Sequence, residues 1–189
     1  MAEFIEPDVE VCRMMEKGQG KSYHWKLHMD GSSNTHESGV EIVILTPEGD
    51  IVECAMRFDF KATNNQAEYE ALLAGLKVYV TLGADEKEIF SNSQVVVNQV
   101  LDQYQARNNC MMAYLEIANR LLRKFKEYKI TQIPREENKR ADALSKLALA
   151  TNCIRSKTIP VAHLTRPSTI EPEEFIVAEI RPQSNNWTT

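Results

Sequence analysis

The sequence predicts a mixed α/β domain in which helices pack on a five-stranded mixed sheet. Two observations support this fold class. Three strand-like runs with short connections come first, between residues 25 and 58, and predict an antiparallel meander. Runs with apolar residues at helical spacing then alternate with two further strand-like runs, up to residue 149. The predicted order of elements is therefore β-β-β-α-β-α-α-β-α.

The first predicted strand covers residues 25–32 and carries a carboxylate near its end. Apolar residues alternate along it, and Asp30 is followed at once by the small residues Gly31 and Ser32. A strand that delivers an aspartate to its own end holds a charge at the rim of a sheet. The alternative is that Asp30 only starts a turn, which is the commoner role of such a residue considered alone.

Turns and a capping motif define the elements that follow. Strands at 39–45 and 51–58 are joined by a segment with turn chemistry, since it contains Pro47 and Gly49. Thr63 and Gln66 then have the spacing of a capping box, so a helix is predicted to start there and to end at Gly83. The remaining predicted elements are a strand at 88–91, helices at 92–101 and 108–125, a strand at 128–133 and a last helix at 138–149.

Two acids lie near the starts of predicted helices. Glu68 is expected in the first turn of the helix after Thr63, and Asp142 near the start of the last helix. The alternative role for Glu68 is to complement the helix dipole without any chemical function.

The composition is that of an ordinary globular protein. Of its 189 residues 43% are apolar, with only 7 Gly and 7 Pro. We expect residues 1–23 to be a lead-in or linker and residues 24–150 to form the domain. Residues 151–189 are rich in Pro and Glu and suit an extended tether more than a second core, although two short apolar patches, at 159–164 and 175–180, could add strands or dock on the domain.

Cysteine usage and hydropathy indicate the setting. The four cysteines are far apart and include no C-x-x-C pair, so the sequence predicts neither a zinc knuckle nor a disulfide framework. A reducing, intracellular setting, in cytoplasm or nucleus, fits best. Residues 1–5 lack the pattern of a signal peptide, and no apolar run is long enough to cross a bilayer. We therefore expect a protein that is not secreted, has no membrane partner and is monomeric as an isolated domain.

Charge is distributed unevenly along the chain. The net charge is -5, yet residues 120–146 carry nine Lys and Arg against four acidic residues. A local basic face of this kind can bind phosphates even on an acidic protein. The alternative for residues such as Arg123, Lys124 and Lys126 is a solvated helix surface, which is the commoner explanation of such a run.

Four ordered blocks of residues, taken together, carry a resemblance. The blocks Asp30–Asn34, Ala62–Leu72, Asn92–Gln99 and Pro134–Leu144 resemble the ribonuclease H domain of plant gypsy-type LTR retrotransposons. The resemblance covers about residues 25–150 and implies a ribonuclease H-like fold. It also implies reverse transcriptase and integrase domains of the same polyprotein as partners, because residues 1–5 and 159–164 are similar to the segments that join them.

The resemblance implies a nuclease that binds RNA/DNA hybrids and hydrolyses the RNA strand. Such a site uses two Mg²⁺ ions, for which Mn²⁺ can substitute, and needs several carboxylates that converge on one rim. By resemblance, Asp30 bridges both ions and Asp142 binds the ion that activates water. Glu68 and the residue after the fourth strand, Asn92, occupy the positions that bind the ion on the leaving-group side.

The chain departs from the family at Asn92. The family pattern reads Ser-Asp-Ser-Gln where this chain has Ser91-Asn92-Ser93-Gln94. An amide offers only a neutral carbonyl oxygen, so Mg²⁺ affinity should fall and cleavage should be lost or strongly reduced. Hybrid binding should survive, because most of the contact surface is elsewhere. Natural decay, domestication and a deliberate substitution would all give this residue.

Two other functions remain open from the sequence. The first is a non-catalytic, domesticated module that binds nucleic acid or a protein partner. The second, an integrase-like transposase on a related fold, is weaker because it leaves the block from Asn64 to Glu68 unexplained.

Hybrid recognition calls for short hydrogen-bonding groups near the rim, because 2′-hydroxyls mark only one strand of a hybrid. For Asn64 and Ser93, helix capping is an alternative of similar weight. The residues that the resemblance or their polarity places against the hybrid are Gly31, Ser32, Asn64, Asn65, Ser93 and Gln94.

Overall fold

The computed structural model describes residues 25–84, 86–139, 156–158 and 162–170. The predicted linker at 1–23, most of the predicted tether and nearly all of the last helix, Asp142 included, lie outside these residues. Residues 135–139 are helical, three residues earlier than predicted. In the part of the chain that the structure describes, no helix is long and apolar enough to cross a membrane.

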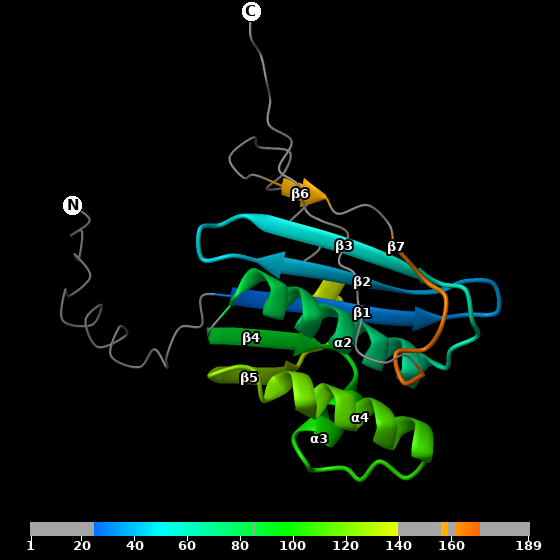
Figure 1. Cartoon of the computed structure of the whole chain (residues 1–189). Helices are drawn as coiled ribbons and strands as arrows, with labels where there is room; N and C mark the ends of the chain where they lie inside the picture. The colour runs from blue at the N-terminus through cyan, green and yellow to red at the C-terminus, as the bar shows by residue number, and fades with distance from the viewer. Residues whose placement is uncertain (1–24, 85, 140–155, 159–161, 171–189) are drawn as a thin grey trace, which may run out of the picture.

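One mixed sheet organises the domain (Figure 1). Its order is β5-β4-β1-β2-β3-β6, and β7 also pairs with β3. The β1–β2 and β2–β3 pairs are antiparallel, as predicted for the meander, and the other pairs are parallel. The strands are β1 (Trp25–Ser33), β2 (Ser38–Leu45), β3 (Ile51–Phe58), β4 (Glu86–Ser91), β5 (Glu127–Gln132), β6 (Ser156–Thr158) and β7 (Ala162–Leu164).

The fold class and all five predicted strands are confirmed, but the strand number is wrong because the described residues form seven. The two extra strands come from the segment that we expected to be a tether. Both run parallel to β3, with Ser156 opposite Ile51 and Ala162 opposite Met56. A sheet edge presents unpaired N–H and C=O groups, and even short extended segments can satisfy them. The division of the chain at residue 150 stays a prediction.

Helix α2 (Asn64–Leu82) lies in front of the strands in Figure 1, and α4 (Asn109–Leu122) and α3 (Gln94–Val100) lie together below β5 in this view. The capping box is confirmed, since Thr63 Oγ1 accepts from the Gln66 N–H at 3.2 Å and Gln66 Oε1 accepts from the Thr63 N–H at 2.8 Å. The first turn of α2 holds no acidic residue, so Glu68 lies beyond it and the dipole explanation is weakened.

The core lies between α2 and the sheet, and it places α2 very close to β1. A Cβ added to Gly75 of α2 would lie 2.6 Å from Leu27 Cδ2 on β1. Residues 135–139 lie behind the sheet in Figure 1, on the face opposite α2. Groups from both faces can therefore reach the end of β1.

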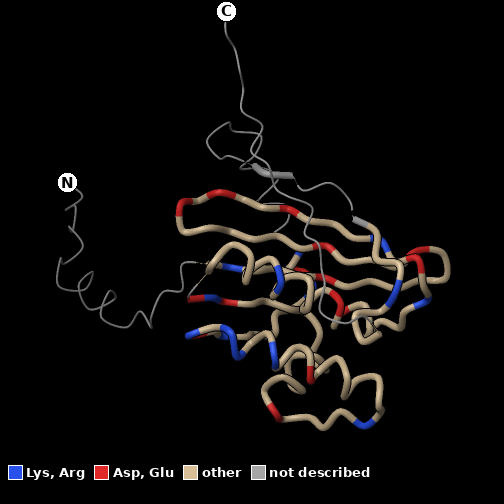
Figure 2. The backbone as a smooth tube through the Cα atoms, in the orientation of Figure 1, with Lys and Arg blue, Asp and Glu red and all other residues tan. Residues whose placement is uncertain are grey.

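Three of the basic residues, Arg123, Lys124 and Lys126, lie at the opposite end of the parallel strands from Asn92. Figure 2 shows Lys and Arg gathered on β5 and the turn before it. Arg123, Lys124 and Lys126 precede Glu127, where β5 begins, whereas Asn92 follows the last residue of β4. The length of a six-residue strand, about 20 Å, separates the two ends. Any phosphate backbone that these basic residues contact would therefore lie well away from the rim.

Candidate nuclease site

The parallel pairing of β1 and β4 brings two of the predicted site residues together. Met29 on β1 is the partner of Ser91 on β4, and each is followed directly by a candidate residue, Asp30 and Asn92. Both side chains are half-buried. The sheet register alone therefore places the first-strand aspartate beside the substituted position.

A hydrogen bond attaches Glu68 to the same rim. The N–H of Gly31 donates to Glu68 Oε2 at 3.2 Å, joining β1 to α2. A Cβ at residue 31 would lie 2.3 Å from the backbone carbonyl carbon and oxygen of Ala67, so only glycine permits this approach. Gly31 was predicted to face the RNA strand, but its N–H is already engaged by Glu68.

Burial and a neighbouring acid control the charge of Glu68. Its side chain is 8% exposed. The pKa of Glu68 is raised to about 7: burial is the main cause and Asp30 adds to the rise, while the Gly31 N–H and Arg135 oppose it. The Gly31 N–H is the one donor that the described residues give this carboxylate. A cation bound beside this carboxylate would stabilise its ionised form.

The chemistry of the rim fits a divalent cation. Asp30 Oδ1 is buried and accepts no hydrogen bond from the described residues. An ionised oxygen that is buried without a donor is costly unless a cation faces it. Within those residues, no three His, Cys, Asp or Glu side chains cluster as a metal site would require. The described part of the rim supplies the carboxylates of Asp30 and Glu68 and the amide of Asn92. Asp142 lies outside the described residues.

Asn138 belongs to the rim and was not predicted. Its side chain is 8% exposed, and its Nδ2 donates to the Met29 carbonyl oxygen at 2.9 Å and to Asn92 Oδ1 at 3.3 Å. The residue lies within the block Pro134–Leu144 that carried the resemblance, but nothing in the spacing indicated its partners. Its contacts also show that the helix that begins at 135 approaches the ends of β1 and β4.

The predicted nucleic-acid contacts divide into exposed and engaged groups. Asn64 and Asn65 are exposed at the start of α2, and because Thr63 is the cap, the capping role considered for Asn64 is wrong. Ser93 does cap α3, since its Oγ accepts from the Val96 N–H at 3.3 Å. The exposed Gln94 donates to the Tyr104 hydroxyl at 3.4 Å, and Ser32 is exposed on β1.

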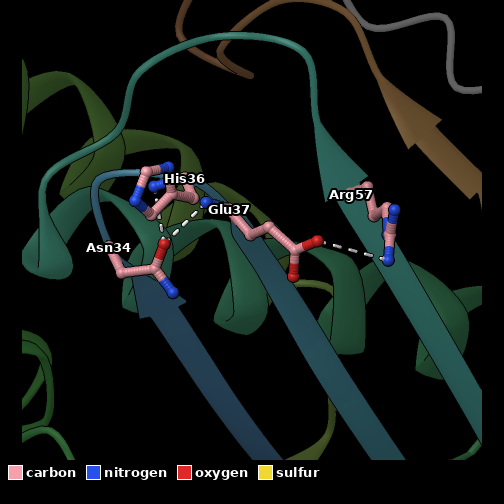
Figure 3. A network of polar contacts seen from close by, with 4 residues as sticks. All are labelled: Asn34, His36, Glu37 and Arg57. Carbon is pink, nitrogen blue, oxygen red and sulfur yellow. Dashed lines mark hydrogen bonds and ion pairs between the residues drawn. The ribbon is translucent and has the colours of Figure 1, made fainter.

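A polar groove continues from Asp30 along the β1–β2 turn to β3 and β7. Figure 3 shows how the turn is fixed: Asn34 Oδ1 accepts from the backbone N–H of His36 at 2.8 Å and of Glu37 at 2.6 Å. Glu37 and Arg57 approach to 3.7 Å, an exposed pair that contributes little to stability. The groove gives a long, flat ligand room to extend beyond the rim.

Comparison with known sequences identifies relatives over most of the domain. A sequence model of the reverse transcriptase-like family matches residues 28–148. A ribonuclease HI of Halobacterium salinarum is 32% identical over 142 residues, which is 74% of this chain and 70% of that protein. A bifunctional protein of Mycobacterium tuberculosis is 27% identical over 165 residues, and the match covers 86% of this chain but only 42% of that protein.

Solved structures have the same fold. The crystal structure of RNase H1 from Halobacterium salinarum superimposes with a TM-score of 0.58 and 34% identity, covering 67% of this chain and 98% of that one. LC11-RNase H1, solved in complex with an RNA/DNA hybrid, gives a TM-score of 0.57 and 26% identity, covering 64% of this chain and 92% of that one.

Proposed function

Since the chain belongs to the reverse transcriptase-like family and carries a ribonuclease H-like domain, we propose that it binds RNA/DNA hybrids at the rim formed by β1, β4 and α2. We propose further that hydrolysis of the RNA strand is lost or strongly reduced in this chain because Asn92 replaces a carboxylate. The observation that carries the proposal is the convergence of Asp30, Glu68 and Asn92 at one rim, where one oxygen of Asp30 has no donor among the described residues.

Each residue has a separate task in the proposed site. Two Mg²⁺ ions, when bound, would supply a nucleophile near neutral pH and balance charge on the leaving oxygen. Asp30 would hold both ions, Glu68 and residue 92 one of them, and Asp142 the other. The raised pKa of Glu68 keeps much of it protonated near neutral pH until a cation is present, since a nearby positive charge favours the ionised form.

Substrate contacts would come from the exposed polar residues beside the rim. Asn64, Asn65 and Gln94 present amides at the starts of α2 and α3, and these amides would contact 2′-hydroxyls and base edges in the shallow minor groove of a hybrid. Ser32 lies near the end of β1, and Ser93 lies at the start of α3. The relative solved with an RNA/DNA hybrid supports this class of ligand for the proposed site.

We also propose a retroelement origin, in which reverse transcriptase and integrase domains precede and follow this one in a polyprotein. The proposal rests on the four blocks that carry the resemblance and on the segments 1–5 and 159–164. A domesticated, non-catalytic binding module is the second candidate, and Asn92 is the observation that favours it. The two candidates share hybrid binding and differ in whether one substitution restores cleavage.

The test compares this chain with the Asn92→Asp variant on four labelled ligands, namely RNA/DNA hybrid, duplex DNA, duplex RNA and single-stranded RNA. Binding is measured in Ca²⁺ and cleavage in Mg²⁺ or Mn²⁺. We expect both proteins to prefer the hybrid and only the variant to cut its RNA strand. Asn119→Ala, a change on α4 away from the rim, is the matched control. Equal affinity for all four ligands would contradict hybrid recognition, and a variant that binds hybrid without cutting it would favour the non-catalytic module.

A further inference from the structure

The Asn138 side chain makes two contacts that no task in the proposed mechanism explains. Its buried Nδ2 carries two hydrogens, and the structure gives each one an acceptor, the Met29 carbonyl oxygen at 2.9 Å and Asn92 Oδ1 at 3.3 Å. One amide group therefore joins the end of β1, the residue after β4 and the helix that begins at 135.

The Met29 contact fixes which way both amides are turned. A backbone carbonyl oxygen can only accept a hydrogen bond, so the atom of Asn138 that faces it has to be the NH₂ group. The same NH₂ group also donates to Asn92, so the Asn92 atom that faces it has to be the oxygen, Oδ1. Turning either amide over would set two acceptors or two donors against each other. The terminal atom of Asn92 that Asn138 does not hold is therefore Nδ2, a donor with no lone pair for a cation.

We propose that Asn138 is a positioning residue that holds one terminal atom of residue 92 and so determines which atom of that residue is available at the site. This inference rests on the proposed function. With aspartate at position 92, Asn138 would hold one carboxylate oxygen and leave the second free to bind a cation. A partner that orients a ligand in this way typically contributes about 10- to 100-fold to metal affinity.

The hydrogen bond from Asn138 to Asn92 Oδ1 also explains why asparagine is a poor substitute for aspartate at position 92. A free amide could turn its carbonyl oxygen toward a cation and act as a weak neutral ligand. Asn138 opposes this turn, because its NH₂ group holds the Asn92 oxygen on its own side and a turned amide would set two donors against each other. The other side of the residue 92 side chain then presents an NH₂ group, whose nitrogen has no lone pair to bind a cation. The loss at Asn92 therefore has two parts, the missing charge and the wrong atom.

A double-mutant cycle on the full chain tests this coupling. Mg²⁺ affinity is measured by titration calorimetry, without nucleic acid, for the parent, Asn92→Asp, Asn138→Ala and the double variant, with Asn119→Ala as control. We expect Asn138→Ala to weaken Mg²⁺ binding about 10-fold or more in the Asn92→Asp background, and not to weaken it in the parent, where the freed Asn92 amide can turn its oxygen toward the cation. A merely structural role would weaken both backgrounds by the same factor, and that result would overturn the proposal.

A second measurement needs no substitution at the buried position, so it does not depend on the folding of Asn138→Ala. Side-chain amide exchange is followed by NMR in the parent, and the Asn138 NH₂ protons should exchange at least about 10-fold more slowly than those of the exposed Asn64. Equal exchange rates would overturn the proposal. Absence of Mg²⁺ binding and of cleavage in every variant would instead contradict the proposed function, and the exchange rates would still show whether the Asn138 NH₂ group is held by hydrogen bonds.

Discussion

Two glutamates on α2, Glu68 and Glu70, show how differently this fold surrounds a buried acid. Glu70 is 1% exposed, and its carboxylate accepts from the Tyr114 hydroxyl at 2.7 Å, the Ser168 N–H at 2.8 Å and the Ser168 hydroxyl at 2.5 Å. Glu68 is 8% exposed and receives one hydrogen bond from the described residues, from Gly31 at 3.2 Å.

The difference lies in what each carboxylate faces. Glu70 faces α4 and the segment 165–170, whose N–H and O–H groups satisfy it, as buried polar groups in stable regions usually are. Glu68 faces a rim that contributes a second acid, Asp30, and the pKa of Glu68 rises to about 7. A strongly perturbed acid with few partners is typical of a functional site. We therefore expect Glu70 to serve stability and Glu68 to serve binding and catalysis.

The largest effect should come from removing Glu70. Glu70→Ala leaves the Tyr114 hydroxyl and both Ser168 donors buried without an acceptor, and we expect it to lower the free energy of unfolding by about 4 kcal/mol. Urea unfolding at pH 7, followed by circular dichroism, measures this loss. Glu68→Ala is the matched control on the same helix, and a larger loss for the control would reverse the assignment of the two acids.

The second-largest effect should be a pH dependence of the unfolding free energy that is caused by Glu68. Its pKa is raised from 4.5 to about 7 by folding, so between these values the folded protein binds more protons than the unfolded chain. The stabilising contribution of protonated Glu68 is complete below pH 4.5 and is lost as pH rises through about 7, a decrease of about 3 kcal/mol.

Glu68→Gln isolates this contribution, since other groups titrate over the same range. The difference in unfolding free energy between the parent and Glu68→Gln should grow between pH 4.5 and 8 in favour of the variant. A difference that does not change with pH would mean that Glu68 titrates normally.

A smaller loss is expected at the contact between β1 and α2. Gly31→Ala would place a methyl group 2.3 Å from the Ala67 backbone, so the strand and the helix have to separate. We expect a loss of about 2 kcal/mol in unfolding free energy, measured by urea unfolding. The same change in the Asn92→Asp background should reduce cleavage, because Glu68 loses its donor. Ser32→Ala, one residue on and exposed, should stay within about 0.5 kcal/mol of the parent.

The smallest predicted effect is that of Ser168→Ala. This change removes the hydroxyl donor to Glu70 but keeps the backbone N–H, so about 1 kcal/mol of stability should be lost in a thermal or urea unfolding experiment. Exposed Ser32→Ala serves again as the reference. A loss as large as that of Glu70→Ala would show that the hydroxyl alone carries the interaction.

Local patterns predicted the parts of the fold that local forces determine. The capping box at Thr63 and Gln66 and the five strands of the domain could be read from the sequence, because spacing and turn residues encode them directly. An added strand at 159–164 was left open, but β6 and the choice of β3 as partner could not be predicted, because a three-residue strand has no periodicity of its own.

The candidate site also combines residues that local sequence patterns predict with contacts that only the packed structure determines. Asp30, Glu68 and Asn92 were recognised as candidates from motif blocks, and the register of β1 and β4 then placed two of them together. The contact of Asn138 with Met29 spans 109 residues, and that of Ser168 with Glu70 spans 98. Which hydrogen-bond partner a polar side chain finds at such a distance depends on the packed structure, and no spacing rule in the sequence states it. The metal-binding roles of the candidates, that of Asp142 included, stay predictions.

Single-turnover cleavage of an RNA/DNA hybrid by Asn92→Asp, set beside the parent at equal occupancy in Mg²⁺, tests the central claim most directly. If the rim is a ribonuclease H centre that lacks one ligand, the variant should cut the RNA strand at least about 100-fold faster than the parent, an effect of the size seen when one charge-stabilising group is restored to an active site. If both proteins bind the hybrid equally and neither cuts it, the substitution at position 92 is not what silences the site, and the rim is not a nuclease centre that lacks a single ligand.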